Sequence, residues 1–212
     1  MIDDVTIIIC CAGMGTRLGI GTTKALVNVF GKPLIMHQLE LMQDVDDVRI
    51  VVGYQAERVI ECVNNIRRDV MYAFNYDFQT TGEAESLSKA LIGLKKYCVI
   101  IDGDLLINKE DFLELINYHG ECIGVCSVNS DEPIYVKMND DIAVEMNESA
   151  GDLEYCCIAK VLSSKLKPWK GSVYSLLNEV LPIKALNIRT RDIDTPEDYE
   201  RMIEWYKNGC EE

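Results

Sequence analysis

The segment CCAGMGTRLGIGTTKALVNVFGKPLI, residues 10–35, follows an apolar strand pattern with a loop rich in glycine. The preceding run VTIIICC (5–11) is continuously apolar, which is typical of a strand covered on both faces of a sheet. Glycines at the carboxyl end of such a strand let backbone N–H groups approach a phosphate chain, and Arg17 and Lys24 add positive charge. The segment therefore indicates an α/β fold whose first loop binds an anion, with a glycine-rich turn that binds nothing as the alternative.

The rest of the chain alternates strand patterns with helical patterns. We expect strands at 48–54, 69–74, 97–102, 121–128 and 183–188, and helices at 33–42, 55–66, 83–94, 109–118 and from Pro196 onward. This alternation predicts a three-layer α/β/α fold with a mostly parallel, Rossmann-like sheet. Residues 132–147 have the pattern of two strands joined by a turn, so we expect a small antiparallel insertion at about 130–160 within one domain, 1–212.

The amino-acid composition of the chain argues against some classes of binding partner. The net charge of -14 and the sequence pI of about 4.6 argue against nucleic acid or an anionic membrane surface. No apolar run approaches the roughly 20 residues of a membrane span, and the opening MIDDV lacks the basic start of a signal peptide. The nine cysteines form no CxxC pair, which favours reduced, buried thiols. We expect a cytoplasmic protein that acts on small molecules, with the oligomeric state left open.

Two familiar phosphate-binding loops do not fit the glycine spacing. Gly13-x-Gly15 continues to Leu18, where a dinucleotide fingerprint needs glycine or alanine, and no GK[ST] of a P-loop follows. GMGTRLG (13–19) followed by TKALVNVFGKPLI (23–35) instead resembles the N-terminal signature of the sugar-phosphate nucleotidyltransferase superfamily. Thr23 stands where that family usually has proline, and the segment between Leu18 and Lys24 is shorter than in most members.

The resemblance continues at three later segments and implies a metal site. VVGY (51–54) is similar to the second strand of the family, and VIIDGDLLI (99–107) and RDIDTPEDYERM (191–202) resemble its two acidic motifs. The resemblance implies that Asp104 and Asp194 bind a catalytic Mg²⁺, for which carboxylate oxygens are suitable ligands. From the residues alone, Asp194 capping the last helix and Asp104 as a loop acid remain alternatives.

The implied reaction is attack of an acceptor phosphate oxygen on the α-phosphorus of a nucleoside triphosphate, with release of pyrophosphate. Arg17 would neutralise the departing β- and γ-phosphates, and Lys24 would contact the α-phosphate as charge develops. The residues expected to bind the nucleotide are Cys11, Ala12, Gly13, Met14, Gly15, Thr16, Tyr76, Thr81, Gly82 and Asp102.

The nucleotide and the acceptor are less well defined by the sequence. NYDFQTTGEAESLSKAL (75–91) lacks Pro-Leu-Gly-Thr-Ala and is more similar to the short CTP:phosphocholine cytidylyltransferase-like members, which favours CTP. Glu145, Glu154 and Tyr155 of the antiparallel region would suit a cationic phosphorylated acceptor such as phosphocholine, for capsule or lipopolysaccharide synthesis. The alternatives are a sugar 1-phosphate acceptor, a molybdopterin-type acceptor and a non-catalytic nucleotide-binding regulatory subunit.

Overall fold

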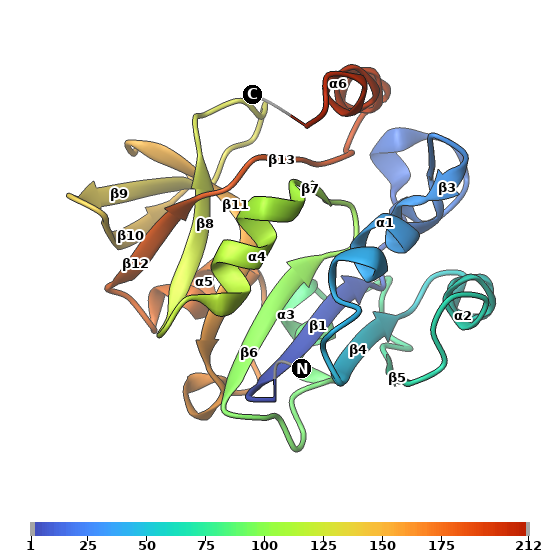
Figure 1. The fold of residues 1–212 in the computed structure, drawn as a ribbon, viewed down its shortest axis with the longest axis horizontal. Coiled ribbons are helices and arrows are strands. Elements are labelled where there is room, and N and C mark those ends of the chain that lie inside the picture. Colours follow the sequence, from blue (N-terminus) through green and yellow to red (C-terminus); the bar gives the residue numbers. More distant parts are fainter. Residues whose placement is uncertain (1–2, 211–212) are drawn as a thin grey trace.

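A sheet of nine strands forms the centre of the computed structural model, which describes residues 3–210 (Figure 1). Its strands are β1 (Val5–Cys11), β4 (Asp47–Val52), β5 (Val70–Phe74), β6 (Tyr97–Asp102), β8 (Cys122–Cys126), β9 (Tyr135–Asn139), β10 (Ile142–Asn147), β11 (Leu153–Leu162) and β12 (Ile183–Asn187). They lie in the order β5-β4-β1-β6-β11-β8-β12-β10-β9. Two short ladders join β2 (Asn28–Val29) to β3 (Lys32–Pro33) and β7 (Leu106–Ile107) to β13 (Thr190–Arg191).

The two halves of the sheet differ in strand direction. Strands β5, β4, β1 and β6 are parallel, whereas β11 runs antiparallel to both β6 and β8. Strand β9 pairs with both β10 and β11, so the far half of the sheet curls back on itself. The expected α/β class with a Rossmann-like sheet and an antiparallel region is confirmed, and the expectation of one domain across 1–212 stays a prediction.

Strand β11 is the main element that the sequence did not predict. It inserts between β6 and β8, which extends the antiparallel pairings beyond the expected 130–160 region. Its register shifts between Tyr155 and Ala159, and Cys157 there has a positive φ of 54°. Such a bulge breaks the alternation of inward and outward side chains from which a strand is predicted.

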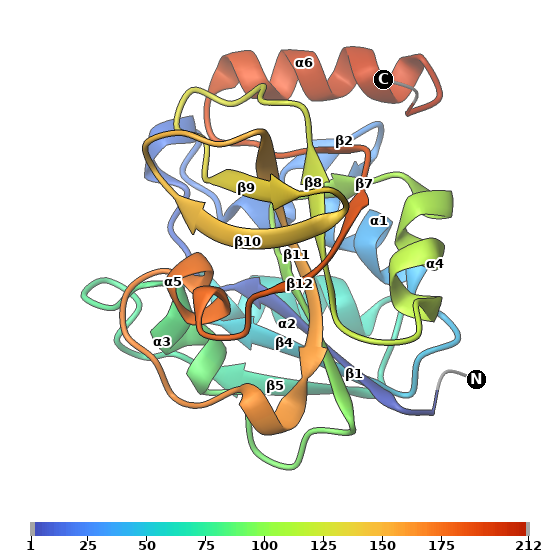
Figure 2. The same ribbon diagram turned by 90° about the vertical axis from the view of Figure 1, so that its left-hand side faces the viewer.

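Helices cover both faces of the sheet and one edge (Figure 2). The helices are α1 (Leu34–Leu41), α2 (Ala56–Asn64), α3 (Glu83–Ser88), α4 (Lys109–Asn117), α5 (Val173–Asn178) and α6 (Pro196–Lys207). Helices α1, α2 and α4 cover one face, α3 and α5 cover the other, and α6 crosses the end of the molecule above β2.

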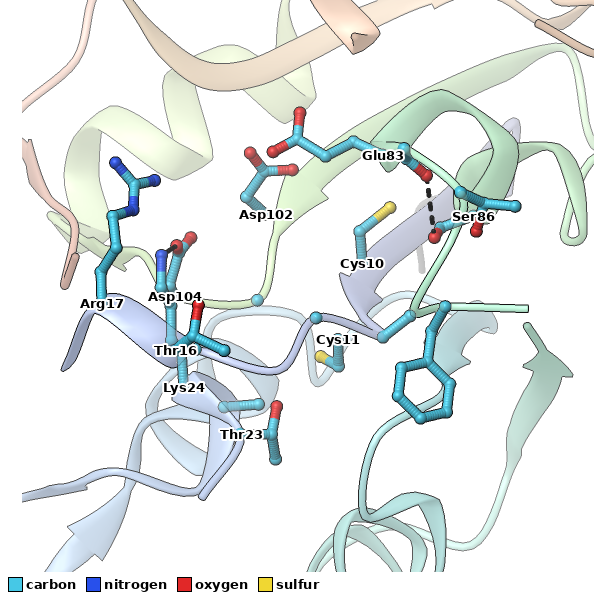
Figure 3. A pocket seen from close by; sticks show the side chains of 18 residues that line it. Cys10, Cys11, Thr16, Arg17, Thr23, Lys24, Glu83, Ser86, Asp102 and Asp104 are labelled. Carbon is cyan, nitrogen blue, oxygen red and sulfur yellow. Dashed lines mark hydrogen bonds and ion pairs between the residues drawn. The ribbon is translucent and has the colours of Figure 1, made fainter. Parts of the chain in front are cut away.

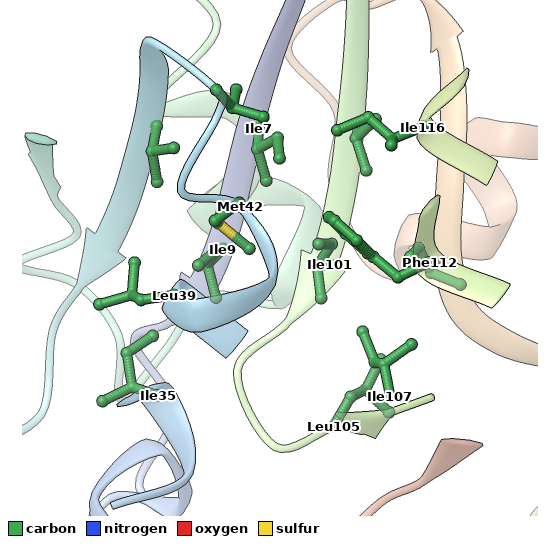
Figure 4. Close-up of a cluster of buried hydrophobic side chains, with 14 of the residues drawn as sticks. Ile7, Ile9, Ile35, Leu39, Met42, Ile101, Leu105, Ile107, Phe112 and Ile116 are labelled. Carbon is green, nitrogen blue, oxygen red and sulfur yellow. The ribbon is translucent and has the colours of Figure 1, made fainter. Parts of the chain in front are cut away.

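Apolar side chains at regular spacing on α1 and α4 pack against the sheet and hold these layers together. In Figure 4, Ile35 and Leu39 of α1 lie over Ile9 of β1, while Phe112 of α4 packs beside Ile101 of β6. All five side chains have at most 2 % of their surface exposed. Burying each contributes roughly 1.5–3 kcal/mol relative to exposure, which fixes the helices on the sheet.

The helix expected at 83–94 ends early, at Ser88. After it the chain turns, with Gly93 at a φ of +67°. The buried Arg49 guanidinium donates hydrogen bonds to the carbonyl oxygens of Ala90, Ile92 and Gly93, so a long-range contact satisfies the backbone groups of this turn.

Two further expectations concern thiols and membranes. Cys11, Cys98, Cys122 and Cys156 are buried free thiols, whereas Cys10, Cys62, Cys126 and Cys157 are only partly buried. None of the helices formed by residues 3–210 combines the length and the apolarity that a membrane crossing requires.

Candidate active site

A cavity of about 290 Å³ opens at the carboxyl ends of β1 and β6 (Figure 3). The loop after β1, the segment that leads into α3 and the loop after β6 form its walls. The lining residues are Cys10, Cys11, Ala12, Gly13, Gly15, Thr16, Arg17, Thr23, Lys24, Ala25, Phe78, Thr81, Gly82, Glu83, Ser86, Asp102, Gly103 and Asp104. Parallel strands place such loops at one edge, where ligands bind in α/β sheets.

Gly103 allows the loop that carries Asp104 to pack against the end of β1. A Cβ atom on Gly103 would lie 2.6 Å from Cys11 Sγ and 2.7 Å from the Cys10 carbonyl oxygen, closer than real Cβ contacts. The Gly103 N–H donates to that carbonyl oxygen at 3.0 Å. Gln38 holds the same loop from α1, because its Nε2 donates to the carbonyl oxygens of Asp102 and Leu105.

Gly15 leaves room for the Lys24 side chain, as Gly103 leaves room for the end of β1. The Gly15 φ of +60° is one that side-chain-bearing residues rarely adopt, and an added Cβ would lie 3.1 Å from Lys24 Cγ. The next residues form a 3₁₀ turn, Thr16–Leu18, whose Leu18 N–H donates to the Gly15 carbonyl oxygen. Glycine at this position therefore gives the loop its turn and leaves room for the lysine.

Asp194 lies at the entrance to α6 but does not cap it. The Thr195 hydroxyl accepts the Asp198 N–H, and the Asp198 carboxylate accepts the N–H groups of Asp194 and Thr195 at 3.2 and 2.8 Å. This reciprocal capping box fixes the backbone at Asp194. The Asp194 carboxylate is consequently left for ion pairs.

Residues distant in the sequence meet at the charged end of the cavity. Lys24 Nζ lies 2.6 Å from Asp104 Oδ2 and also contacts Asp194 Oδ1. Arg17 reaches Asp194 Oδ2 at 3.0 Å and Glu132 Oε2 at 2.7 Å. Burial alone would lower the pKa of Lys24, but the two aspartates outweigh it and raise that pKa well above its usual value. The lysine is therefore a firmly protonated bridge between the two aspartates.

The donor set at this bridge is compatible with a magnesium ion. Two carboxylates lie within reach of one cation, and their side chains are 19 % and 26 % exposed, so a hydrated ion has access to them. Within residues 3–210, no three His, Cys, Asp or Glu side chains are grouped to hold a metal ion by themselves. Mg²⁺ commonly uses only one or two carboxylates and takes its other ligands from phosphates and water. The residues present therefore fit Mg²⁺ bound together with a phosphate-bearing substrate.

Further carboxyl groups lie near this charged end, and two of them, Glu83 and Asp102, line the cavity. In Figure 3 the side chains of Glu83 and Asp102 point toward one another. Burial and the charge of Asp104 raise the pKa of both groups, and the charge of Glu83 raises the pKa of Asp102 further. Burial, Asp104 and Asp194 likewise raise the pKa of Asp192 to about 6. Among the ion pairs formed within residues 3–210, none involves Glu83, Asp102 or Asp192, so these carboxyl groups have no cationic partner of their own.

Most of the residues predicted to bind the nucleotide line the cavity, but two do not. Met14 is absent from its walls, and Tyr76 lies outside, with 82 % of its surface exposed and its ring stacked on Phe74 at a centroid distance of 5.6 Å. The turn after β5 directs Tyr76 to solvent and brings Phe78 to the wall instead.

The three residues predicted to bind the acceptor lie away from the cavity walls. Glu145 is exposed on β10 and pairs with Lys137 at 2.8 Å. Glu154 is 8 % exposed and its carboxylate accepts the N–H groups of Asn129 and Ser130, so it supports that loop. Tyr155 is 5 % exposed within the core, and its hydroxyl has no hydrogen-bond partner among the described residues. The pleat and bulge of β11 explain why neither residue faces the cleft.

Some lining residues were not predicted as ligands from the sequence. They are Cys10, Thr23, Ala25, Phe78, Glu83, Ser86 and Gly103. Glu83 could have been found, because it directly follows Gly82 and begins the expected helix, so it lies in the first turn beside a candidate ligand residue. No sequence signal distinguishes Phe78 from its exposed aromatic neighbours.

Comparison with known proteins agrees with this architecture. Residues 7–178 match the family described as the MobA-like NTP transferase domain. Bifunctional GlmU proteins from Methanocaldococcus jannaschii and Methanococcus maripaludis are 29 % and 25 % identical over 63 % and 87 % of this chain. The chain covers only 33 % and 45 % of those two relatives.

Solved structures share the fold along nearly the whole chain. CTP:phosphocholine cytidylyltransferase from Streptococcus pneumoniae superimposes with a TM-score of 0.78 at 19 % identity, covering 96 % of this chain and 99 % of that one. The inositol-1-phosphate CTP transferase from T. maritima gives 0.75 at 16 %, covering 95 % and 96 %. The match to the domain family extends over most of the sequence and includes the cavity loops after β1 and β6. This chain belongs to the MobA-like NTP transferase domain family.

Proposed function

We propose that this chain transfers CMP from CTP to a small phosphorylated acceptor and releases pyrophosphate. The observation that carries the proposal is the contact of Lys24 with both Asp104 and Asp194, beside Arg17, at one end of the cavity. Two cations and two carboxylates at one point are suited to a polyphosphate and its counterion.

The proposed step is an in-line displacement. An oxygen of the acceptor phosphate forms a bond to the α-phosphorus while the bond from that phosphorus to the bridging β-oxygen breaks, and pyrophosphate takes the electron pair. A phosphate monoester is already a nucleophile, so positioning and charge neutralisation suffice. Backbone N–H groups around Gly13 and Gly15 bind phosphate oxygens, Arg17 neutralises the leaving β- and γ-phosphates, and Lys24 moves from its aspartates to the α-phosphate.

Asp104 and Asp194 are the proposed ligands of Mg²⁺. The ion supplies charge neutralisation on the transferring phosphoryl oxygens when it is bound. Since both carboxylates contact Lys24 in the present arrangement, the ammonium group keeps the two acids together until substrate arrives.

The segment between β5 and α3 supports cytosine as the base. Its N–H groups at Asp77, Thr80, Thr81 and Gly82 are all bonded within the protein. The part of the wall at Thr81 and Gly82 therefore offers mainly oxygen acceptors, which suit the exocyclic amino group of cytosine better than the O4 of uracil or thymine. Adenine also has an amino group, and the similarity of residues 75–91 to short cytidylyltransferases favours cytosine.

The carboxyl groups without an ion-pair partner among the described residues support a cationic acceptor. Glu83 and Asp102 lie in the cavity wall, in contrast to the acids of the antiparallel region. A quaternary or primary ammonium group next to the reacting phosphate would stabilise their ionised form, which burial disfavours. Phosphocholine, or another phosphate-bearing precursor of capsule or lipopolysaccharide, meets this requirement, and we propose a cytoplasmic location.

Sugar 1-phosphates are the second class of candidate acceptor. GlmU proteins are similar to this chain in sequence, and a putative glucose-1-phosphate thymidylyltransferase from Bacillus anthracis shares its fold. The latter superimposes with a TM-score of 0.77 at 19 % identity. A molybdopterin-type acceptor is the third candidate, and a non-catalytic, nucleotide-binding regulatory subunit is the fourth.

Measurement of pyrophosphate release tests the proposal. The protein is incubated with Mg²⁺, each nucleoside triphosphate and a panel of phosphocholine, phosphoethanolamine, sugar 1-phosphates and molybdopterin. We expect release with CTP and a cationic acceptor, and a loss of at least about 100-fold in Asp104→Asn. Release only with a sugar 1-phosphate would favour the second candidate, and tight nucleotide binding without release for any acceptor would favour a regulatory subunit.

A further inference from the structure

Asn75 lies behind the part of the cavity wall that precedes and begins α3. Its side-chain amide makes three hydrogen bonds to residues of that segment. Asn75 follows β5 and is fully buried. Its Nδ2 donates to Thr81 Oγ1 at 2.8 Å and to Ser86 Oγ at 2.9 Å, while its Oδ1 accepts the Asp77 N–H at 3.1 Å. Its own N–H donates to the Val52 carbonyl oxygen at 2.8 Å, which anchors it to the sheet.

The two hydroxyl groups that Asn75 contacts belong to residues that line the cavity. Because each accepts a hydrogen bond from Asn75, its own proton must point elsewhere. Thr81 Oγ1 donates to the Asp77 carbonyl oxygen at 2.9 Å, and Ser86 Oγ donates to the Gly82 carbonyl oxygen at 3.2 Å. Both hydroxyl protons are thus bound to carbonyl oxygens of the wall, and the Asn75 amide occupies one acceptor position on each hydroxyl oxygen.

We propose that Asn75 is a positioning residue that fixes the nucleobase wall and sets the preference for a base with an amino group. This inference rests on the proposed function, because it assumes that the base lies against Thr81, Gly82 and Ser86. Asn75 does not line the cavity itself and acts through those residues. Without it, the hydroxyl groups rotate and offer protons to the ligand, so a keto base is accepted as readily as an amino base.

A merely structural role for Asn75 makes a different prediction. Loss of its hydrogen bonds would then lower the stability of the fold and leave the ratio of affinities for CTP and UTP unchanged. The ratio is therefore the decisive quantity, since both nucleotides carry the same triphosphate and ribose.

The experiment measures binding of CTP and UTP, each with Mg²⁺, by calorimetry to the full chain and its variants. Asn75→Ala removes the amide, and Thr81→Val removes one hydroxyl on the partly exposed rim and keeps the side-chain size. The matched control is Asn178→Ala, because the Asn178 amide likewise makes hydrogen bonds within the protein, two of them, both to the Met146 backbone, but lies on α5 away from the cavity walls.

We expect Asn75→Ala to weaken CTP binding at least about tenfold, or about 1.4 kcal/mol, and to bring the CTP:UTP affinity ratio close to one. Thr81→Val should reduce the ratio in the same direction, and the double variant should be no worse than Asn75→Ala because the hydroxyl acts through the amide. Asn178→Ala should keep both affinities within about twofold. Thr81→Val provides the test if Asn75→Ala does not fold.

The outcomes separate this inference from the function on which it rests. If the wild-type chain binds CTP in preference to UTP and the ratio is unchanged in Asn75→Ala and Thr81→Val, the inference is overturned and the proposed function stands. It is also overturned if Asn178→Ala changes the ratio equally. If the wild-type chain binds no nucleoside triphosphate, both fail.

Discussion

Replacement of Lys24 tests the arrangement at the charged end of the cavity. Lys24→Met keeps most of the side-chain length and removes the ammonium group that contacts Asp104 and Asp194. The two carboxylates then face each other with only Arg17 nearby, and Arg17 is bound to Asp194 and Glu132. We therefore expect Lys24→Met to lose stability as well as turnover.

The magnitude follows from burial. Breaking a fully buried ion pair by removing one partner costs about 3–5 kcal/mol. The three side chains here are 19–26 % exposed, so solvent screening reduces the expected loss to about 2 kcal/mol. For a chain of 212 residues this corresponds to a decrease in Tm of about 4–8 °C.

The assay is thermal unfolding at pH 7 in EDTA and with increasing Mg²⁺. In Lys24→Met the ion meets two carboxylates without a competing ammonium group, so a concentration ten times its Kd should restore about 1.4 kcal/mol. The wild-type chain should gain less, because Lys24 competes with the ion for the same oxygens. Loss of turnover in this variant should persist with Mg²⁺, since the cation at the α-phosphate is still missing.

The control is Lys32→Met. Lys32 pairs with Glu40 at 2.7 Å, but both side chains are more than 40 % exposed, so its removal should change stability by less than about 1 kcal/mol. The reasoning is refuted if Lys24→Met unfolds at the wild-type temperature in EDTA and Mg²⁺ stabilises both proteins equally. That result would mean that the two carboxylates do not depend on the ammonium group.

Two further predictions concern residues outside the charged end. Asp111 is buried and accepts three hydrogen bonds from Arg189; burial alone would raise its pKa, but Arg189 outweighs this and lowers it. Asp111→Asn should therefore lower the free energy of unfolding by about 1–3 kcal/mol at pH 7. The deficit should shrink as the pH falls below about 4, because the unfolded wild-type chain then binds a proton at Asp111 that the native carboxylate, with its lowered pKa, does not. A constant deficit in denaturant titrations from pH 3 to 7 would contradict this. Tyr155→Phe removes a buried hydroxyl without a partner among the described residues, so stability should be unchanged or slightly higher, by up to about 1 kcal/mol, and the acceptor KM unchanged. A large increase in that KM would instead support the assignment of Tyr155 to the acceptor site.

The local elements of this protein were predictable from its sequence. Continuous apolar runs predicted β1 and β6 to within a residue, because strands covered on both faces need no alternation. The start of α6 was predicted from Thr195, Pro196 and Asp198, whose capping interactions span only a few residues. The glycine-rich loop and the two acidic motifs likewise identified the family and most of the cavity lining.

Contacts between distant residues were decided only by the tertiary structure. The sequence pointed to Lys24, Asp104 and Asp194 but placed the lysine on a phosphate, whereas in the structure it bridges the two acids across 80 and 170 residues. Glu83 and Asn75 entered the site because β5 runs parallel to β4 and β1 and so ends at the same end of the sheet as β1. Tyr155 turned into the core because β11, which lies between β6 and β8, has a bulge directly after it. Periodicity and capping are local interactions, whereas partners and side-chain direction depend on which strands become neighbours.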